Sequence, residues 1–233
     1  MRFIKTLAAT LLIMLANIPL NANAALILEL ETIFSNGPNP LGTAPWLRAT
    51  FTQIDNNNVT LTMDNLLNDS NEFVSLWAFN LEPFNTGVTT TFVSNNRGDL
   101  DAASVSSGLN FKKMNGTGGK YDILFSFANS GVGRFKSGDQ ITYNFMRTGL
   151  KEADFNFLSY GNASTPFTSA AHIQAIGTNG DSTWLGGGEN GGGGPPQVLV
   201  PEPTSLLLLG MGLLGLGGLR RHKANLTSLP KAS

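Results

Sequence analysis

The sequence predicts an all-β fold, an antiparallel β-sandwich of jelly-roll type, with a barrel as the runner-up. Three observations support this prediction. Between Ala25 and Leu185, apolar residues alternate with polar ones at a period of two, which is typical of half-buried strands. Glycine, asparagine, aspartate and serine separate the apolar runs, and no stretch shows the spacing of an amphipathic helix. We therefore expect about eight to ten short strands in one domain, residues 25–185.

The strands can be assigned in chain order, and one of them differs from the rest. Residues 73–81 are apolar on both faces, so this strand is predicted to lie at the centre of the fold. Residues 46–54 and 59–66 flank a turn of aspartate and asparagine, so they form a predicted hairpin. The other expected strands are 25–33, 89–93, 109–112, 121–128, 140–145, 154–158 and 170–176.

The N-terminus has the three parts of a secretory signal peptide, residues 1–24. Arg2 and Lys5 give a cationic start, and an apolar run follows. Ala22 and Ala24 are the small residues that signal peptidase requires before the cleaved bond. An uncleaved membrane anchor is the alternative, but the apolar run is shorter than the roughly 20 residues that span a bilayer. We expect export by the general secretion machinery and cleavage after Ala24.

The C-terminus contains a linker, a short apolar segment and a basic cluster. Residues 186–200 are rich in glycine and proline, which predicts a flexible linker. Residues 205–219 carry no charge and, as a transmembrane helix, would barely span a hydrocarbon core of about 30 Å; a buried core helix is the alternative. Arg220 and Arg221 should stay in the cytoplasm, which places the preceding chain outside the inner membrane. Residues 224–233 would form a cytoplasmic tail.

Residues 201–223 resemble a known sorting signal. Pro201, Glu202 and Pro203 precede the apolar segment, and the arginine pair follows it. These elements, in this order, resemble the PEP-CTERM signal of Gram-negative bacteria, whereas the rest of the chain is only loosely similar to other PEP-CTERM ectodomains. The resemblance implies processing by an exosortase, a membrane-embedded cysteine transpeptidase, and delivery to the cell surface, the outer envelope or the medium. It also implies a link to biofilm and exopolysaccharide. The sequence departs from the usual pattern in one respect, because ten residues follow the basic cluster.

The composition restricts the chemistry of the domain. The absence of cysteine excludes disulfides, thiolate metal sites and cysteine nucleophiles. The 15 lysines and arginines nearly balance the 16 acidic residues, so no nucleic-acid partner is predicted. Two histidines are too few for a zinc site, and no cofactor is expected, although a structural calcium ion needs only oxygen ligands. The candidate calcium ligands are Asp64, Asn65, Asp99 and Asp101.

Three functions stay open, and a non-catalytic exported surface or extracellular-matrix protein is the leading one. A secreted glycan-active hydrolase would need His172 or a pair of carboxylates. Because no nucleophile motif is present, His172 is predicted to be a partly exposed strand residue without a catalytic role. The candidate carboxylates are Glu72, Glu82, Asp122 and Asp139. A carbohydrate-binding module would need exposed aromatic rings. The alternative role of such rings at strand positions is packing in the core. The candidate rings are Trp46, Trp77, Phe84 and Trp184.

Overall fold

The computed structural model describes residues 24–84, 87–114, 119–161, 165–188 and 197–199. The predicted signal peptide, PEP-CTERM segment and tail lie outside these ranges, apart from Ala24. Within them, no helix has both the length and the apolar character needed to cross a bilayer.

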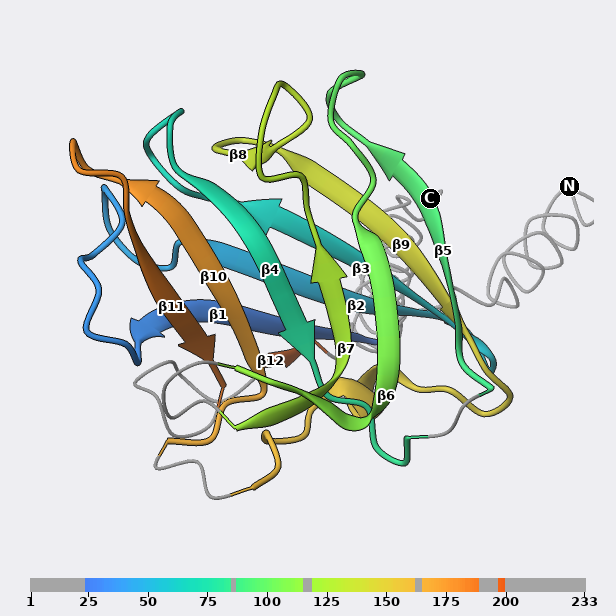
Figure 1. Cartoon of the computed structure of the whole chain (residues 1–233). Helices are drawn as coiled ribbons and strands as arrows, with labels where there is room; N and C mark the ends of the chain where they lie inside the picture. The colour runs from blue at the N-terminus through green and yellow to red at the C-terminus, as the bar shows by residue number, and fades with distance from the viewer. Residues whose placement is uncertain (1–23, 85–86, 115–118, 162–164, 189–196, 200–233) are drawn as a thin grey trace, which may run out of the picture. The chain divides into compact units, whose positions relative to one another are not determined.

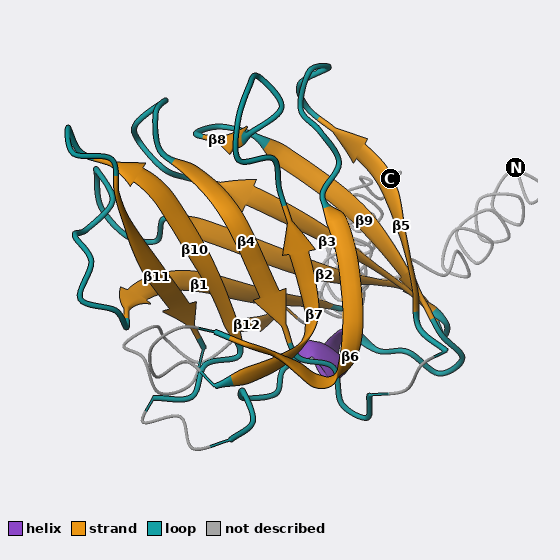
Figure 2. Ribbon diagram, viewed as in Figure 1, coloured by secondary structure: helices purple, strands orange, loops and turns teal. Residues whose placement is uncertain are grey.

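The described chain consists of twelve strands and one short 3₁₀ helix, with every strand pair antiparallel (Figure 2). The strands are β1 (Ala25–Ile33), β2 (Leu47–Asp55), β3 (Asn58–Asn65), β4 (Phe73–Phe79), β5 (Thr89–Asn95), β6 (Ser104–Lys113), β7 (Lys120–Ser126), β8 (Phe135–Lys136), β9 (Gln140–Met146), β10 (Ser169–Ile176), β11 (Asp181–Gly187) and β12 (Gln197–Leu199). The predicted all-β class and the β2–β3 hairpin are confirmed. The strand predicted at 154–158 is wrong, because Glu152–Phe155 forms the 3₁₀ helix η1.

All the strands belong to a single sheet in the order β5-β9-β3-β2-β1-β11-β10-β4-β7-β6, with β12 paired to β1 and β8 paired to β4. The sheet curves until it is nearly closed into a barrel, and β5 and β6 are its two edges (Figure 1). β1 hydrogen-bonds to β2 on one side and to β11 on the other, so no break divides the strands into two sheets. The architecture is therefore closer to the predicted runner-up, the barrel, than to a two-sheet jelly roll.

The inner face of the curved sheet holds the main hydrophobic core. Burial alternates along β1, β2, β3 and β9, as the period of two in the sequence predicts. Phe51 of β2 contacts Phe79 of β4 edge to face at 5.3 Å, although three strands lie between β2 and β4 in the sheet order. Phe155 of η1 stacks on Phe51 at 4.2 Å, so this helix fills the core from one end. Each aromatic pair contributes about 0.5–1.5 kcal/mol beyond its buried area.

A second, smaller hydrophobic cluster covers the outer face of β4, β7, β10 and β11. Its buried members are Ala78, Met114, Tyr121, Leu124, Ala170 and Trp184. This cluster explains why β4 is apolar on both faces, as the sequence indicates. The prediction that β4 is the central strand is nonetheless wrong, because β4 is eighth of ten in the sheet order.

The glycine tract predicted to be linker from residue 186 begins inside the sheet. Gly186 and Gly187 are the last residues of β11, and both are buried. A Cβ atom added at Gly187 would lie 2.1 Å from the carbonyl oxygen of Glu29 in β1. The absence of a side chain at Gly187 therefore lets β11 approach β1 closely.

We expect Gly187→Ala to lower the free energy of unfolding by about 1–3 kcal/mol, since the added methyl group can be accommodated only if the β1 backbone moves. Gly98→Ala is the matched control, because a Cβ at Gly98 meets nothing within 4 Å. Denaturant unfolding of both variants measures the difference. Equal stability of the two variants would contradict the packing at Gly187.

Candidate functional site

His172 lies on the outer face of β10, opposite a β-bulge in β4. His172 pairs with Leu76 and Ile173 pairs with Val74, so Ser75 is the extra residue of β4. The bulge brings the Ser75 Oγ atom to 2.9 Å from His172 Nδ1 and 3.2 Å from the His172 carbonyl oxygen. The sequence indicates His172 but not Ser75, because the local pattern of β4 does not encode a bulge that depends on its partner strand.

Trp184 and Gln174 complete the surroundings of the imidazole. The Trp184 ring stacks on His172 with centroids 4.4 Å apart, and Gln174 Nε2 lies 3.4 Å from Nδ1. Burial lowers the pKa of His172, because the imidazolium loses hydration in this position. The side chain is therefore a neutral imidazole at pH 7, partly buried on its strand as predicted.

The Ser75 and His172 pair has two of the three parts of a serine nucleophile site. Among the described residues, no carboxylate hydrogen-bonds to the imidazole. Ser75 is only 2% exposed, so an external substrate can reach its Oγ atom only if β4 moves. In this arrangement the pair connects β4 to β10 at the bulge.

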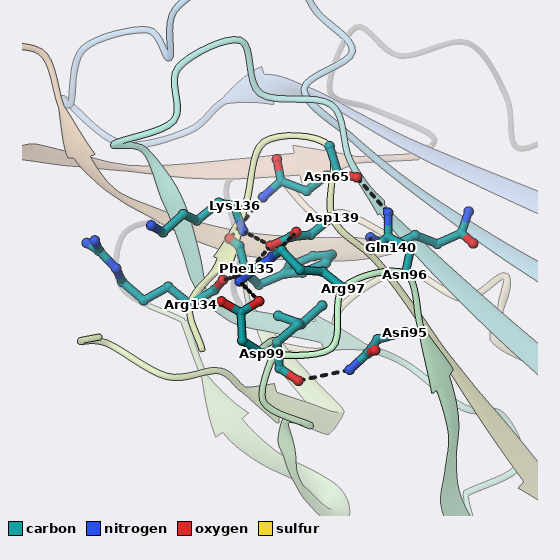
Figure 3. Close-up of polar contacts among 12 residues, drawn as sticks. Asn65, Asn95, Asn96, Arg97, Asp99, Arg134, Phe135, Lys136, Asp139 and Gln140 are labelled. Atoms are coloured by element: carbon teal, nitrogen blue, oxygen red, sulfur yellow. Dashed lines mark hydrogen bonds and ion pairs between the residues drawn. The ribbon is translucent and has the colours of Figure 1, made fainter. Parts of the chain in front are cut away.

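A polar network surrounds Arg97, in the loop after β5 (Figure 3). Arg97 donates to both Asp139 carboxylate oxygens, at 2.8 and 2.9 Å. The Asp99 carboxylate and the carbonyls of Val132 and Arg134 accept its other three N–H groups. All five donors are thus satisfied, and the hydrogen bond to Asp139 raises the pKa of Arg97 further.

Asp139 connects this network to the β8–β9 turn. Its side chain is 5% exposed and also accepts the Lys136 backbone N–H at 2.7 Å. Asn96 strengthens the same junction, because it donates to the Gly138 carbonyl and accepts from the Gln140 N–H (Figure 3). The network therefore fastens the loop after edge strand β5 to the turn before β9. The sequence gives a weak signal for it, an arginine within a polar turn that contains two aspartates.

Three of the four predicted calcium ligands have other side-chain contacts in the structure, and Asp101 donates its backbone N–H to the Gly133 carbonyl. Asp64 accepts from Gln140 Nε2 at 2.7 Å, and Asn65 donates to the Phe135 carbonyl at 3.0 Å. Asp99 pairs with Arg97. Within the described ranges, no group of three or more acidic or histidine side chains gathers as a metal site would require.

The candidate carboxylates of a hydrolase have different surroundings in the structure. Glu72 is buried and accepts the Leu41 N–H at 2.9 and 3.2 Å, and burial raises its pKa. Asp122 accepts two backbone N–H groups, whereas Glu82 is exposed. Asp139, the fourth candidate, is held by Arg97.

The candidate sugar-stacking rings are core residues. Trp46, Trp77 and Trp184 are 6%, 0% and 8% exposed, and Phe84 packs against the main core. None of these three tryptophans presents a ring face to solvent, so the aromatic platform predicted for a carbohydrate-binding module is not formed by them. The exposed aromatic side chains of the described chain are instead Phe92, Phe111, Phe157 and Tyr160.

Comparison with family models identifies one segment of the chain. Residues 199–221 match the model of the PEP-CTERM protein-sorting motif. The chain carries a PEP-CTERM sorting signal. The resemblance predicted from Pro201, Glu202, Pro203 and the arginine pair at Arg220 and Arg221 is thereby confirmed, although these residues lie outside the described ranges. A PEP-CTERM signal implies export, transit through a membrane and an exosortase as processing partner.

No curated protein and no solved structure matches the chain. The match therefore covers the sorting signal alone, and the chemistry of the domain rests on its own geometry.

We expect Arg97→Lys to lower the free energy of unfolding by about 1–2 kcal/mol, because a lysine cannot satisfy both Asp139 and the three further acceptors. Arg48→Lys is the matched control, since its pair with Glu29 is exposed and worth less than about 1 kcal/mol. Chemical denaturation of both variants measures the difference. If the two substitutions cost the same, the Arg97 network contributes no more than a surface pair.

We expect the His172 imidazole to titrate below the unfolded value of about 6.5. Since the unfolded chain then binds the proton more readily, His172 lowers stability as the pH falls from about 6.5 through the native pKa. The C2-proton resonance, followed by NMR in a His222→Gln variant that keeps a single histidine, gives this pKa directly. A midpoint at or above 6.5 would contradict the burial of the imidazole.

Proposed function

We propose that the chain is a non-catalytic exported protein whose nearly closed β-barrel domain is delivered to the cell surface or extracellular matrix after exosortase processing. The match of residues 199–221 to the PEP-CTERM motif carries this proposal. The signal-peptide pattern at residues 1–24, with Ala22 and Ala24 before the cleaved bond, agrees with it. Before processing, the apolar segment at 205–219 anchors the protein in the inner membrane.

The contacts of the domain's polar groups support a structural rather than a catalytic role. Asp139 and Glu72 accept backbone hydrogen bonds, and the Ser75 hydroxyl is buried against His172. In each case the polar group holds two segments of the fold together. Such a domain is suited to display at a surface, with biofilm or exopolysaccharide as its setting.

Replacement of Pro201, Glu202 and Pro203 by alanine is expected to block C-terminal processing, since the two prolines keep the recognised triplet extended. An epitope inserted in the exposed turn at Asn129–Gly131 reports on the protein without touching either terminus. Immunoblots of membrane, surface and medium fractions should show a shortened native protein and a full-length variant that is retained in the membrane.

The matched control for this experiment replaces Asn225, Leu226 and Thr227 by alanine, because these tail residues lie beyond the matched motif. The control should be processed like the native chain. If the triplet variant has the same mass and location as the native protein, the proposed processing is wrong.

A further inference from the structure

Two lysines and a tyrosine form a row across three neighbouring segments. Lys113 of β6 pairs directly with Lys120 of β7, and Lys120 pairs with Tyr160 on its other side. Lys120 and Tyr160 exchange both backbone hydrogen bonds, at 2.9 and 3.1 Å. Because directly opposite residues of an antiparallel pair project to the same face, the three side chains lie side by side, neighbouring Cβ atoms being about 5 Å apart.

In the part of the chain that the structure describes, no acidic side chain forms an ion pair with this row. Like charges directly opposite each other destabilise a strand pair, and no ion pair among the described residues includes Lys113 or Lys120. The sequence has no acidic residue between Asp101 and Asp122. A lysine on edge strand β6 would by itself protect the sheet edge, but Lys120 lies on β7, which is not an edge.

Exposed apolar side chains accompany the lysines. Phe111 precedes Lys113 by two residues and is 44% exposed, and Tyr160 is 65% exposed. Between Ser107 and Lys112 the β6–β7 register is interrupted, and this bulge presents Leu109 with 65% of its surface exposed.

A buried carboxylate holds the bulge in place. Asp122 is 5% exposed and accepts the Asn110 N–H at 2.6 Å and the Leu81 N–H at 3.1 Å. Asn110 has a φ of 50°, in the left-handed region that non-glycine residues seldom adopt. The exposure of Leu109 is therefore built into the fold rather than left to a free loop.

We propose that the basic aromatic patch, defined as Leu109, Phe111, Lys113, Lys120 and Tyr160, binds the surface of an anionic phospholipid bilayer. The two unpaired lysines complement anionic headgroups. Aromatic and aliphatic side chains beside them enter the interface between headgroups and acyl chains. The sorting signal brings the chain to a membrane, and the proposal does not depend on the exosortase step.

The apolar content of the patch favours a bilayer over a soluble polyanion. An acidic polysaccharide would use the lysines and the two aromatic rings, but it gives no apolar environment to Leu109. A second copy of this chain is disfavoured because a symmetric contact would bring the same unpaired lysines against each other. Both remain distinguishable outcomes of the test.

The test uses the full chain, which has no cysteine and therefore accepts a single fluorophore at an introduced one. Leu109→Cys labels the patch. Val132→Cys labels a control site, since Val132 is 67% exposed and follows the opposite end of β7. Each labelled chain is reconstituted in vesicles that contain a nitroxide-bearing lipid, made of phosphatidylcholine alone or of phosphatidylcholine and phosphatidylglycerol in equal parts.

We expect the nitroxide lipid to quench the label at residue 109 in the phosphatidylglycerol vesicles and much less in phosphatidylcholine alone, with the label at 132 unquenched in both. Lys113→Gln with Lys120→Gln should lower the apparent equilibrium constant for contact between the patch and the bilayer, measured from the quenched fraction of the label, roughly 30-fold. Arg134→Gln with Lys136→Gln removes the same amount of charge beyond the other end of β7 and should leave this equilibrium constant unchanged. Tyr160→Cys provides a second label site if the 109 variant does not fold.

Equal quenching at the patch and the control site would overturn the proposal. Equal quenching of the label at residue 109 in vesicles with and without phosphatidylglycerol would also overturn it. A change in the emission of the fluorophore at residue 109 that grows with protein concentration in the absence of vesicles would assign the patch to a second copy instead. A change in the emission of this fluorophore on addition of alginate, a soluble acidic polysaccharide, but not on addition of vesicles would assign the patch to a glycan. Either result would overturn the bilayer proposal.

Discussion

The pairing of β1 with both β2 and β11 is the constraint on which the rest of the fold depends. Through β1, the strands from β5 to β2 and those from β11 to β6 become one sheet. If β1 paired on one side only, the same strands would form two sheets facing each other, as the sequence predicts. The contact requires a close approach of backbones at Gly187, where any Cβ would collide with Glu29. One glycine that the sequence assigns to a linker therefore helps to decide the architecture.

A continuous sheet must bend to enclose a core, and β-bulges give it that freedom. Register shifts occur in the pairs of β1 with β11, β4 with β10, β5 with β9 and β6 with β7. Two of these bulges also place polar groups, because one directs Ser75 to His172 and another exposes Leu109. The local features most relevant to binding or chemistry are thus consequences of closing the sheet.

The period-two pattern is enough to predict the strand class and the β2–β3 hairpin, because these depend on local alternation and on the residues of one turn. It could not predict β11, which ends in glycines whose role depends on Glu29 of another strand. Nor could it find Ser75, or the row of Lys113, Lys120 and Tyr160, since those arise from cross-strand register. The sorting signal was readable because its parts are contiguous in sequence.

The two ends of β7 differ in how charge is compensated. Beyond its C-terminal end, the loop that contains Val132 and Arg134 is held by Arg97, whose charge is neutralised by aspartates and whose five donors are all used. At its N-terminal end, Lys120 faces Lys113, and neither lysine has an acidic partner among the described residues. The first arrangement stabilises the fold by itself. The second places two like charges side by side, which is unfavourable within the strand pair, and this is the charge that the proposed anionic bilayer would compensate.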